Sequence, residues 1–208
     1  MHIDSDYKTL GTFPINVIQP LIDLANELDW SLPDFSRNGH YLDNAIVRVP
    51  YNIRKEPPQE ITPTIQRVLD CFWPIDAYMR TLYPDHVFIK CEMNWIKPNE
   101  NIPIHIDPCW WHGVSHRIHV PIITNDDCFF LVEGRPHHFE VGKYYEVNNR
   151  KYHSVSNTGT HGRLHLVFDA MPQTVYNDAI AQSIDISEVN VTPYKLDSFE
   201  NLPKDLLL

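Results

Sequence analysis

The hydrophobic pattern of this chain changes its period after Pro84, and this change constrains the fold more than any other feature. Beyond that point apolar and polar side chains alternate, as where Lys90 separates Ile89 from Cys91. Successive side chains of a strand point to opposite faces, so the pattern predicts strands with one face in the core and the other toward water or a polar cavity. The segments with this alternation are 88–96, 116–123 and 163–169.

Helical spacing dominates the first part of the chain instead. Apolar residues recur every three to four positions in 16–30, which predicts a helix. A second helix is expected after Thr62 and Pro63, which suit an N-cap and the first helical position. Pro74 is expected to kink or end that helix before a final segment. The short apolar stretch 45–49 predicts a strand.

Two helices followed by several short strands predict a mainly β fold with the N-terminal helices packed outside. A double-stranded β-helix, the jelly roll of cupin-like proteins, fits best because its polar-lined mouth can hold a metal. Gly134 and Gly142 mark turns between the strands. We expect a single domain over 1–208, with the jelly-roll core at 86–170 and an irregular C-terminal tail at 172–208.

Composition excludes several classes of function. Apolar residues make up 43% of the chain and charged residues 21%, which are ordinary globular values. The formal net charge of −10 argues against nucleic acid, whose phosphates need a basic surface. No apolar run approaches the length of a membrane helix, and the N-terminus lacks the features of a secretion signal. Four cysteines without Cys-x-x-Cys spacing favour reduced thiols. We expect a cytoplasmic protein without a membrane partner, and leave its oligomeric state open.

A metal site is suggested by His105-Ile106-Asp107. In a regular strand residues i and i+2 point to the same side, so His105 and Asp107 can reach one ion. The third ligand must come from another strand, and His153 is the best candidate. Two histidines and a carboxylate on one face leave adjacent positions open, which suits non-haem Fe(II) and oxygen chemistry. The tripeptide alone is weak evidence, since His2-Ile3-Asp4 repeats it at the N-terminus.

Six short motifs follow one another between residues 94 and 169. They are Asn94-Trp-Ile-Lys-Pro98, His105-Ile-Asp107, Arg117-Ile-His119-Val-Pro-Ile, Gly142-Lys-Tyr-Tyr-Glu-Val-Asn-Asn, His153-Ser-Val-Ser-Asn157 and Arg163-Leu-His-Leu-Val-Phe-Asp169. Their order and spacing resemble the aspartyl/asparaginyl β-hydroxylase family of Fe(II)- and 2-oxoglutarate-dependent oxygenases. Some free-proline hydroxylases are similar as well. The resemblance covers about residues 86–170.

The resemblance implies a role for each matching residue. The His-Asp-His set would bind Fe(II), and Arg163 would clamp the distal carboxylate of 2-oxoglutarate with Asn94 as a polar partner. A guanidinium suits this task because it offers two parallel donors to a carboxylate. Arg117 and His119 would lie near the cosubstrate or a substrate carboxylate. Vertebrate-type members lack the carboxylate ligand, so Asp107 moves this chain toward bacterial hydroxylases.

The reaction implied is a dioxygenase reaction that consumes O2 and 2-oxoglutarate and releases succinate and CO2. The substrate would be a small molecule or a peptide that bears a carboxylate. The enzyme would hydroxylate either an amino acid or an Asp, Asn or Pro residue. Arg48 is a further residue that could meet the substrate. Two alternatives stay open: a cupin-type metal-dependent isomerase or hydrolase, and a non-catalytic module that binds a metal or 2-oxoglutarate.

Five further residues attract attention but receive no role in the site. His165 shares a face with Arg163, yet it equally suits a polar position within the sheet. His112 and His116 are spaced like a zinc pair, although nothing around them is periodic as in a helix. Trp110 and Trp111 could cover a substrate, but aromatic packing is the commoner role.

Overall fold

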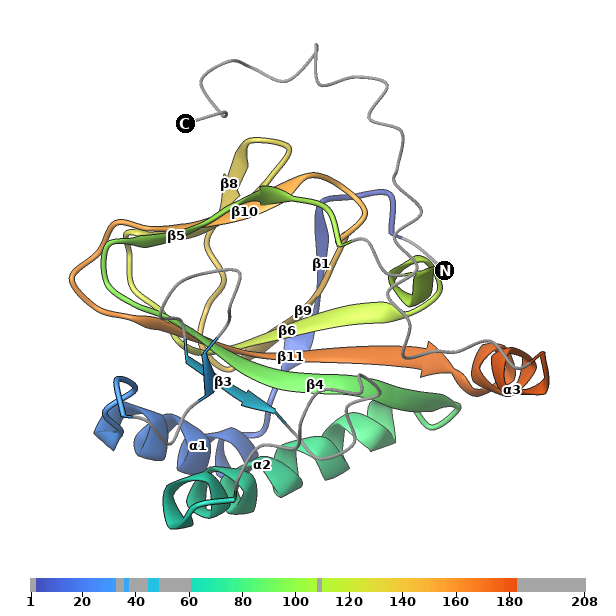
Figure 1. The fold of residues 1–208 in the computed structure, drawn as a ribbon, viewed down its shortest axis with the longest axis horizontal. Helices are drawn as coiled ribbons and strands as arrows, with labels where there is room; N and C mark the ends of the chain where they lie inside the picture. Colours follow the sequence, from blue (N-terminus) through green and yellow to red (C-terminus); the bar gives the residue numbers. More distant parts are fainter. Residues whose placement is uncertain (1–2, 33–35, 38–44, 49–60, 108–109, 183–208) are drawn as a thin grey trace.

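The protein folds as two antiparallel sheets that face each other (Figure 1). A computed structural model describes residues 3–32, 36–37, 45–48, 61–107 and 110–182. The strands are β1 (Tyr7–Thr12), β2 (Ser36–Arg37), β3 (Ala45–Arg48), β4 (His86–Ile96), β5 (Glu100–His105), β6 (His116–Ile123), β7 (Cys128–Val132), β8 (Arg135–His137), β9 (Lys143–Val147), β10 (His153–Asn157) and β11 (Arg163–Pro172). The helices are α1 (Ile15–Glu27), α2 (Pro63–Leu82), the 3-10 helix η1 (Trp110–Gly113) and α3 (Gln173–Ala181).

The larger sheet has seven strands in the order β1-β9-β6-β11-β4-β3-β2, and the smaller has four in the order β5-β10-β7-β8. Long antiparallel ladders join β11 to β4 and β6, with His165 opposite Asn94 and Asp169 opposite Arg117. Directly opposed residues project to the same face of a sheet. The predicted polar faces of these strands therefore form one surface, and it is turned toward the smaller sheet. This arrangement is the jelly roll that the alternation predicts.

The outer face of the larger sheet is apolar and packs against α1 and α2 (Figure 1). Leu164, Leu166 and Phe168 of β11 belong to this main core together with Phe72 of α2. A second core fills the space between the two sheets and includes Phe130. The predicted placement of the N-terminal helices outside the jelly roll is thus confirmed.

Two expectations from the sequence are wrong in part. Pro74 does not end the second helix, because α2 runs unbroken through it and buries Phe72 and Ile75 on either side. The tertiary packing of this face outweighs one missing backbone hydrogen bond. The chain after 172 is not irregular throughout, since 173–181 forms α3 beside β11. Residues 183–208 lie outside the described part of the chain.

The N-terminal signals of α2 act as predicted: Thr62 Oγ1 accepts a hydrogen bond from the Ile65 amide at 3.2 Å. Cys71, Cys91 and Cys128 are free thiols, and Cys109 lies outside the described residues. Among the described helices, none combines the length and apolarity needed to cross a bilayer.

Candidate metal and cosubstrate site

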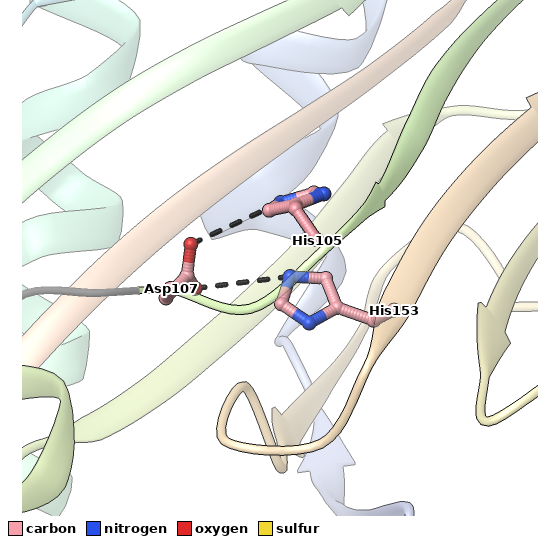
Figure 2. A group of neighbouring side chains, drawn as sticks. All are labelled: His105, Asp107 and His153. Atoms are coloured by element: carbon pink, nitrogen blue, oxygen red, sulfur yellow. Dashed lines mark ion pairs between the residues drawn. The ribbon is translucent and has the colours of Figure 1, made fainter. Parts of the chain in front are cut away.

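Three side chains converge where the smaller sheet faces the larger one: His105 at the end of β5, Asp107 just beyond it, and His153 at the start of β10 (Figure 2). The β5–β10 ladder places the two histidines opposite each other. The Nε2 atoms of His105 and His153 lie 3.9 and 3.8 Å from the nearer Asp107 oxygens. All three ligand atoms fall within 4.8 Å of one another. Within the described ranges no other group of histidines, cysteines and carboxylates meets this condition.

Both histidines are held in the tautomer that a metal requires. His105 Nδ1 lies 2.8 Å from the Pro103 carbonyl oxygen, and His153 Nδ1 lies 2.9 Å from that of Lys151. A carbonyl oxygen only accepts, so each Nδ1 carries a proton, and each Nε2, which is turned toward Asp107, is the ring atom left to bind a metal. Burial lowers the pKa of His153 to about 4, which keeps its ring neutral. Two imidazole Nε2 atoms and one carboxylate are a donor set that fits Fe(II).

Arg117 fixes Asp107, the predicted carboxylate ligand. Its Nη1 donates to Asp107 Oδ2 in a short contact, while Nε and Nη2 donate to the two Asp169 oxygens at 2.9 and 2.7 Å. Burial alone would raise the pKa of Asp107, but the Arg117 cation, followed by His153, holds it well below its usual range. The carboxylate therefore stays charged and keeps one orientation.

Arg163 is the second buried arginine of the inner face, and its side chain has no carboxylate partner among the residues that the structure describes. Its Nη2 lies 2.6 Å from His165 Nδ1, and the residue is only 3% exposed. Burial lowers the pKa of Arg163 to about 10, so the group remains a cation at neutral pH. A buried guanidinium without a carboxylate partner is suited to bind an anion.

Three rings, those of His165, His119 and Phe130, lie between Arg163 and His153 of the predicted metal-binding set. His119 Nδ1 lies 3.4 Å from His165 Nδ1, and its ring meets the edge of Phe130 at a centroid distance of 5.3 Å. Phe130 in turn stacks on His153 at 5.5 Å. The predicted set of ligands and the predicted clamp thus line one interior, with His119 between them.

The remaining predicted residues divide into two cases. Asn94 stands on the same face, opposite His165, and its amide donates to Glu92 Oε1 at 3.3 Å. Arg117 does not offer a free fork to a cosubstrate or substrate carboxylate, because Asp107 and Asp169 occupy it. Arg117 thus lies on the inner face beside Asp107, as expected, but its guanidinium already contacts two carboxylates.

Sequence reasoning missed three residues of this network. Asp169 and His165 alternate with apolar neighbours in β11. This alternation predicts the correct face for both residues but does not predict which residues they contact. His112 accepts a hydrogen bond from Arg117 Nη2 at 2.8 Å, so its proton sits on Nδ1. The spacing of His112 and His116 had no bearing on this, since His116 instead contacts Glu146 at 2.6 Å.

Trp110, Trp111 and Arg48 are left without a role in the site. Trp111 is fully buried and belongs to a small core cluster, in line with aromatic packing. The side chains of Trp110 and Arg48 lie outside the described part of the structure. Arg48 is placed by its backbone alone, opposite Glu92 in the β3–β4 ladder.

A jelly roll with a His-Asp-His set and a buried arginine facing one interior defines the class of Fe(II)- and 2-oxoglutarate-dependent oxygenases. A sequence model of the aspartyl/asparaginyl β-hydroxylase family matches residues 48–172, which is more than half of the chain. The chain therefore belongs to this family, and it is an enzyme that uses iron and 2-oxoglutarate. A sequence search of curated proteins gives no match.

Solved structures confirm the fold. AviO1 from Streptomyces viridochromogenes Tue57 is 13% identical with a TM-score of 0.53, over 80% of this chain and 89% of that one. SnoN, described as a non-heme α-ketoglutarate-dependent epimerase from nogalamycin biosynthesis, is 15% identical with a TM-score of 0.50, over 80% and 76%. ThoJ, described as a non-heme monooxygenase, is 11% identical with a TM-score of 0.50, over 81% and 74%.

Proposed function

We propose that the protein is a hydroxylase in which His105, Asp107 and His153 hold Fe(II) and Arg163 binds the distal carboxylate of 2-oxoglutarate. The single observation that carries the proposal is the buried Arg163 cation, which no described carboxylate neutralises and which lies on the same interior as the metal-binding set. The products of the reaction would be a hydroxylated substrate, succinate and CO2. Residues 86–170 would form the catalytic core.

Bound iron supplies the activation of O2, coupled to the oxidative decarboxylation of 2-oxoglutarate. The chain itself contributes orientation and exclusion of water. The backbone carbonyls of Pro103 and Lys151 fix the two imidazoles, and Arg117 fixes Asp107. Mutation of a side chain that orients a metal ligand commonly lowers metal affinity or activity by about 10- to 100-fold.

The substrate we propose is an amino acid, free or as an Asp, Asn or Pro residue in a peptide. Family membership supports this choice of chemistry. A substrate carboxylate would not bind Arg117, because two carboxylates already neutralise that side chain. Its recognition would have to come from other groups along the inner face.

Removal of either histidine ligand tests the proposal. His105→Ala and His153→Ala should each abolish succinate formation and Fe(II) binding, because two remaining ligands hold the ion weakly. His161→Ala is the matched control, since this histidine is exposed and its Nδ1 contacts Thr160 Oγ1 at 3.1 Å rather than a residue of the metal-binding set. Succinate release is measured over a panel of free amino acids and Asp-, Asn- or Pro-containing peptides. Undiminished turnover in either ligand variant would overturn the assignment.

Addition of 2-oxoglutarate distinguishes our proposal from the two alternative functions. Under our proposal, anaerobic addition of 2-oxoglutarate to the Fe(II) protein produces a weak visible charge-transfer band. A metal-dependent isomerase or hydrolase would show no such band. A non-catalytic binding module would show the band but release no succinate with any member of the panel.

A further inference from the structure

The contact between Arg163 and His165 fixes the protonation of the imidazole. Arginine only donates hydrogen bonds, so His165 Nδ1, 2.6 Å from Arg163 Nη2, must be an acceptor. The proton of the neutral ring then sits on Nε2. Both residues are buried, with His165 2% exposed, so water does not compete for the contact.

His119 lies beside the same nitrogen. Its Nδ1 lies 3.4 Å from His165 Nδ1, and the two rings meet edge to face at 5.7 Å and 76°. His165 Nδ1 has one lone pair, and Arg163 Nη2 occupies it at 2.6 Å, so the His119 ring packs beside this nitrogen without a second full hydrogen bond to it. Burial and the Arg163 cation both lower the pKa of each imidazole, so the pair is neutral. The arginine is thus placed by uncharged groups.

The nature of this partner distinguishes a receptor from a structural ion pair. A carboxylate that orients a guanidinium also cancels its charge, as Asp169 does for Arg117. A neutral imidazole orients the guanidinium plane through one Nη2 hydrogen bond and leaves the positive charge for a ligand. The other guanidinium N–H groups stay directed by the same rigid plane.

We propose that His165 is a positioning residue for the cosubstrate: by accepting from Arg163 Nη2, it holds the guanidinium in the orientation that receives the distal carboxylate of 2-oxoglutarate, without neutralising it. This inference rests on the function proposed above. The role of His165 does not follow from that of Arg163, because packing against apolar neighbours alone can hold an arginine side chain in place.

Three variants of His165 test the proposal. His165→Asn can keep an acceptor oxygen near the place of Nδ1, whereas His165→Gln moves its acceptor to the place of Nε2, and His165→Leu has none. Leu and Gln should raise the KM for 2-oxoglutarate by about 10- to 100-fold with kcat at saturating cosubstrate changed only a few-fold. Asn should stay within a few-fold of wild type. Equal KM values for Asn, Gln and wild type would overturn the proposal, as would a loss confined to kcat.

A second readout is independent of turnover. Titration calorimetry of 2-oxoglutarate into the Mn(II)-loaded protein should show the same order of affinities, with His161→Leu as a control that binds like wild type. ¹⁵N NMR of the histidine rings should show a protonated Nε2 and an unprotonated Nδ1 for His165; the opposite tautomer contradicts the contact. If wild type itself binds no 2-oxoglutarate, the proposed function fails; if it binds and the variants bind equally well, only the role of His165 fails.

Discussion

The two buried arginines of the inner face have opposite surroundings. Arg117 meets Asp107 and Asp169, and these carboxylates raise its pKa against the effect of burial. Arg163 meets a neutral imidazole, and burial lowers its pKa to about 10. Both lie in the same sheet, on neighbouring strands, with similar exposure. The difference is therefore one of charge compensation rather than of depth.

This difference assigns the two side chains to different tasks. A buried ion pair with full hydrogen bonding fixes geometry, but removing one partner leaves an uncompensated charge. A buried cation without a carboxylate is costly in the free protein, and binding of an anion relieves that cost. We therefore propose that Arg117 supports Asp107, the proposed metal ligand, and that Arg163 binds the cosubstrate.

Loss of Arg117 should have the largest effect on stability. Arg117→Met leaves Asp107 and Asp169 buried without their cation, so we expect the free energy of unfolding to fall by about 3–5 kcal/mol. Urea denaturation measures this decrease: the urea concentration at the midpoint of unfolding should fall, while the dependence of the free energy on urea concentration stays unchanged. The double variant Arg117→Met/Asp169→Leu removes two opposite charges and should recover part of the loss. A decrease below about 1 kcal/mol would contradict the structural role.

Loss of Arg163 should affect binding and spare the fold. In Arg163→Met the buried cation is replaced by an apolar chain, so the free energy of unfolding should stay within about 1 kcal/mol of wild type or increase. Affinity for 2-oxoglutarate should fall by about 100-fold or more, because two charge-assisted hydrogen bonds disappear. Calorimetry on the Mn(II)-loaded protein provides the affinity.

Arg163→Lys is the matched control for charge: it keeps a cation without the fork and should bind 2-oxoglutarate with intermediate affinity. A destabilisation as large as that of Arg117→Met would show that the two arginines are alike, and would remove the contrast on which their assignment depends.

The sequence predicts the faces of the strands better than the partners across them. Alternation places Arg117, Arg163 and Asp169 on polar faces, and the resemblance relates His153 to His105. The pairing of Arg117 with Asp169 depends on the β6–β11 register, which joins residues 52 positions apart. No local pattern reports such a register, so the compensated and the uncompensated arginine look the same in the sequence.

The same limit applies to the helices. The hydrophobic spacing predicts both N-terminal helices, since each has one apolar stripe. It does not predict that α2 continues through Pro74, because this outcome depends on packing of Phe72 and Ile75 against the sheet. It also misses α3, whose position beside β11 is set by the end of the sheet rather than by a strong stripe of its own.

Loss of the ion pair of a third arginine, Arg135, should have the smallest effect on stability. This pair has good hydrogen-bond geometry but an exposed arginine, so it tests whether geometry or burial sets the strength of such a pair. Arg135 meets Asp6 through two hydrogen bonds of 2.7 and 2.6 Å, as good as those of Arg117, but its side chain is 54% exposed. Asp6→Asn should therefore lower the Tm by about 2 °C or less. The hydrogen bond from Arg135, together with Lys151 and His137, holds the pKa of Asp6 below its usual value of 3.8.

Because that pKa is lowered in the folded state, the contribution of Asp6 is complete at neutral pH and is lost as the pH falls below 3.8 through the folded pKa. Melting curves of wild type and Asp6→Asn, recorded from neutral pH into the acid range, should differ slightly at neutral pH and converge in acid. Arg117→Met serves as the buried counterpart in the same series. If Asp6→Asn were as destabilising as Arg117→Met, hydrogen-bond geometry alone would set the strength of these pairs, and burial could not explain why Arg117 and Arg163 have different tasks.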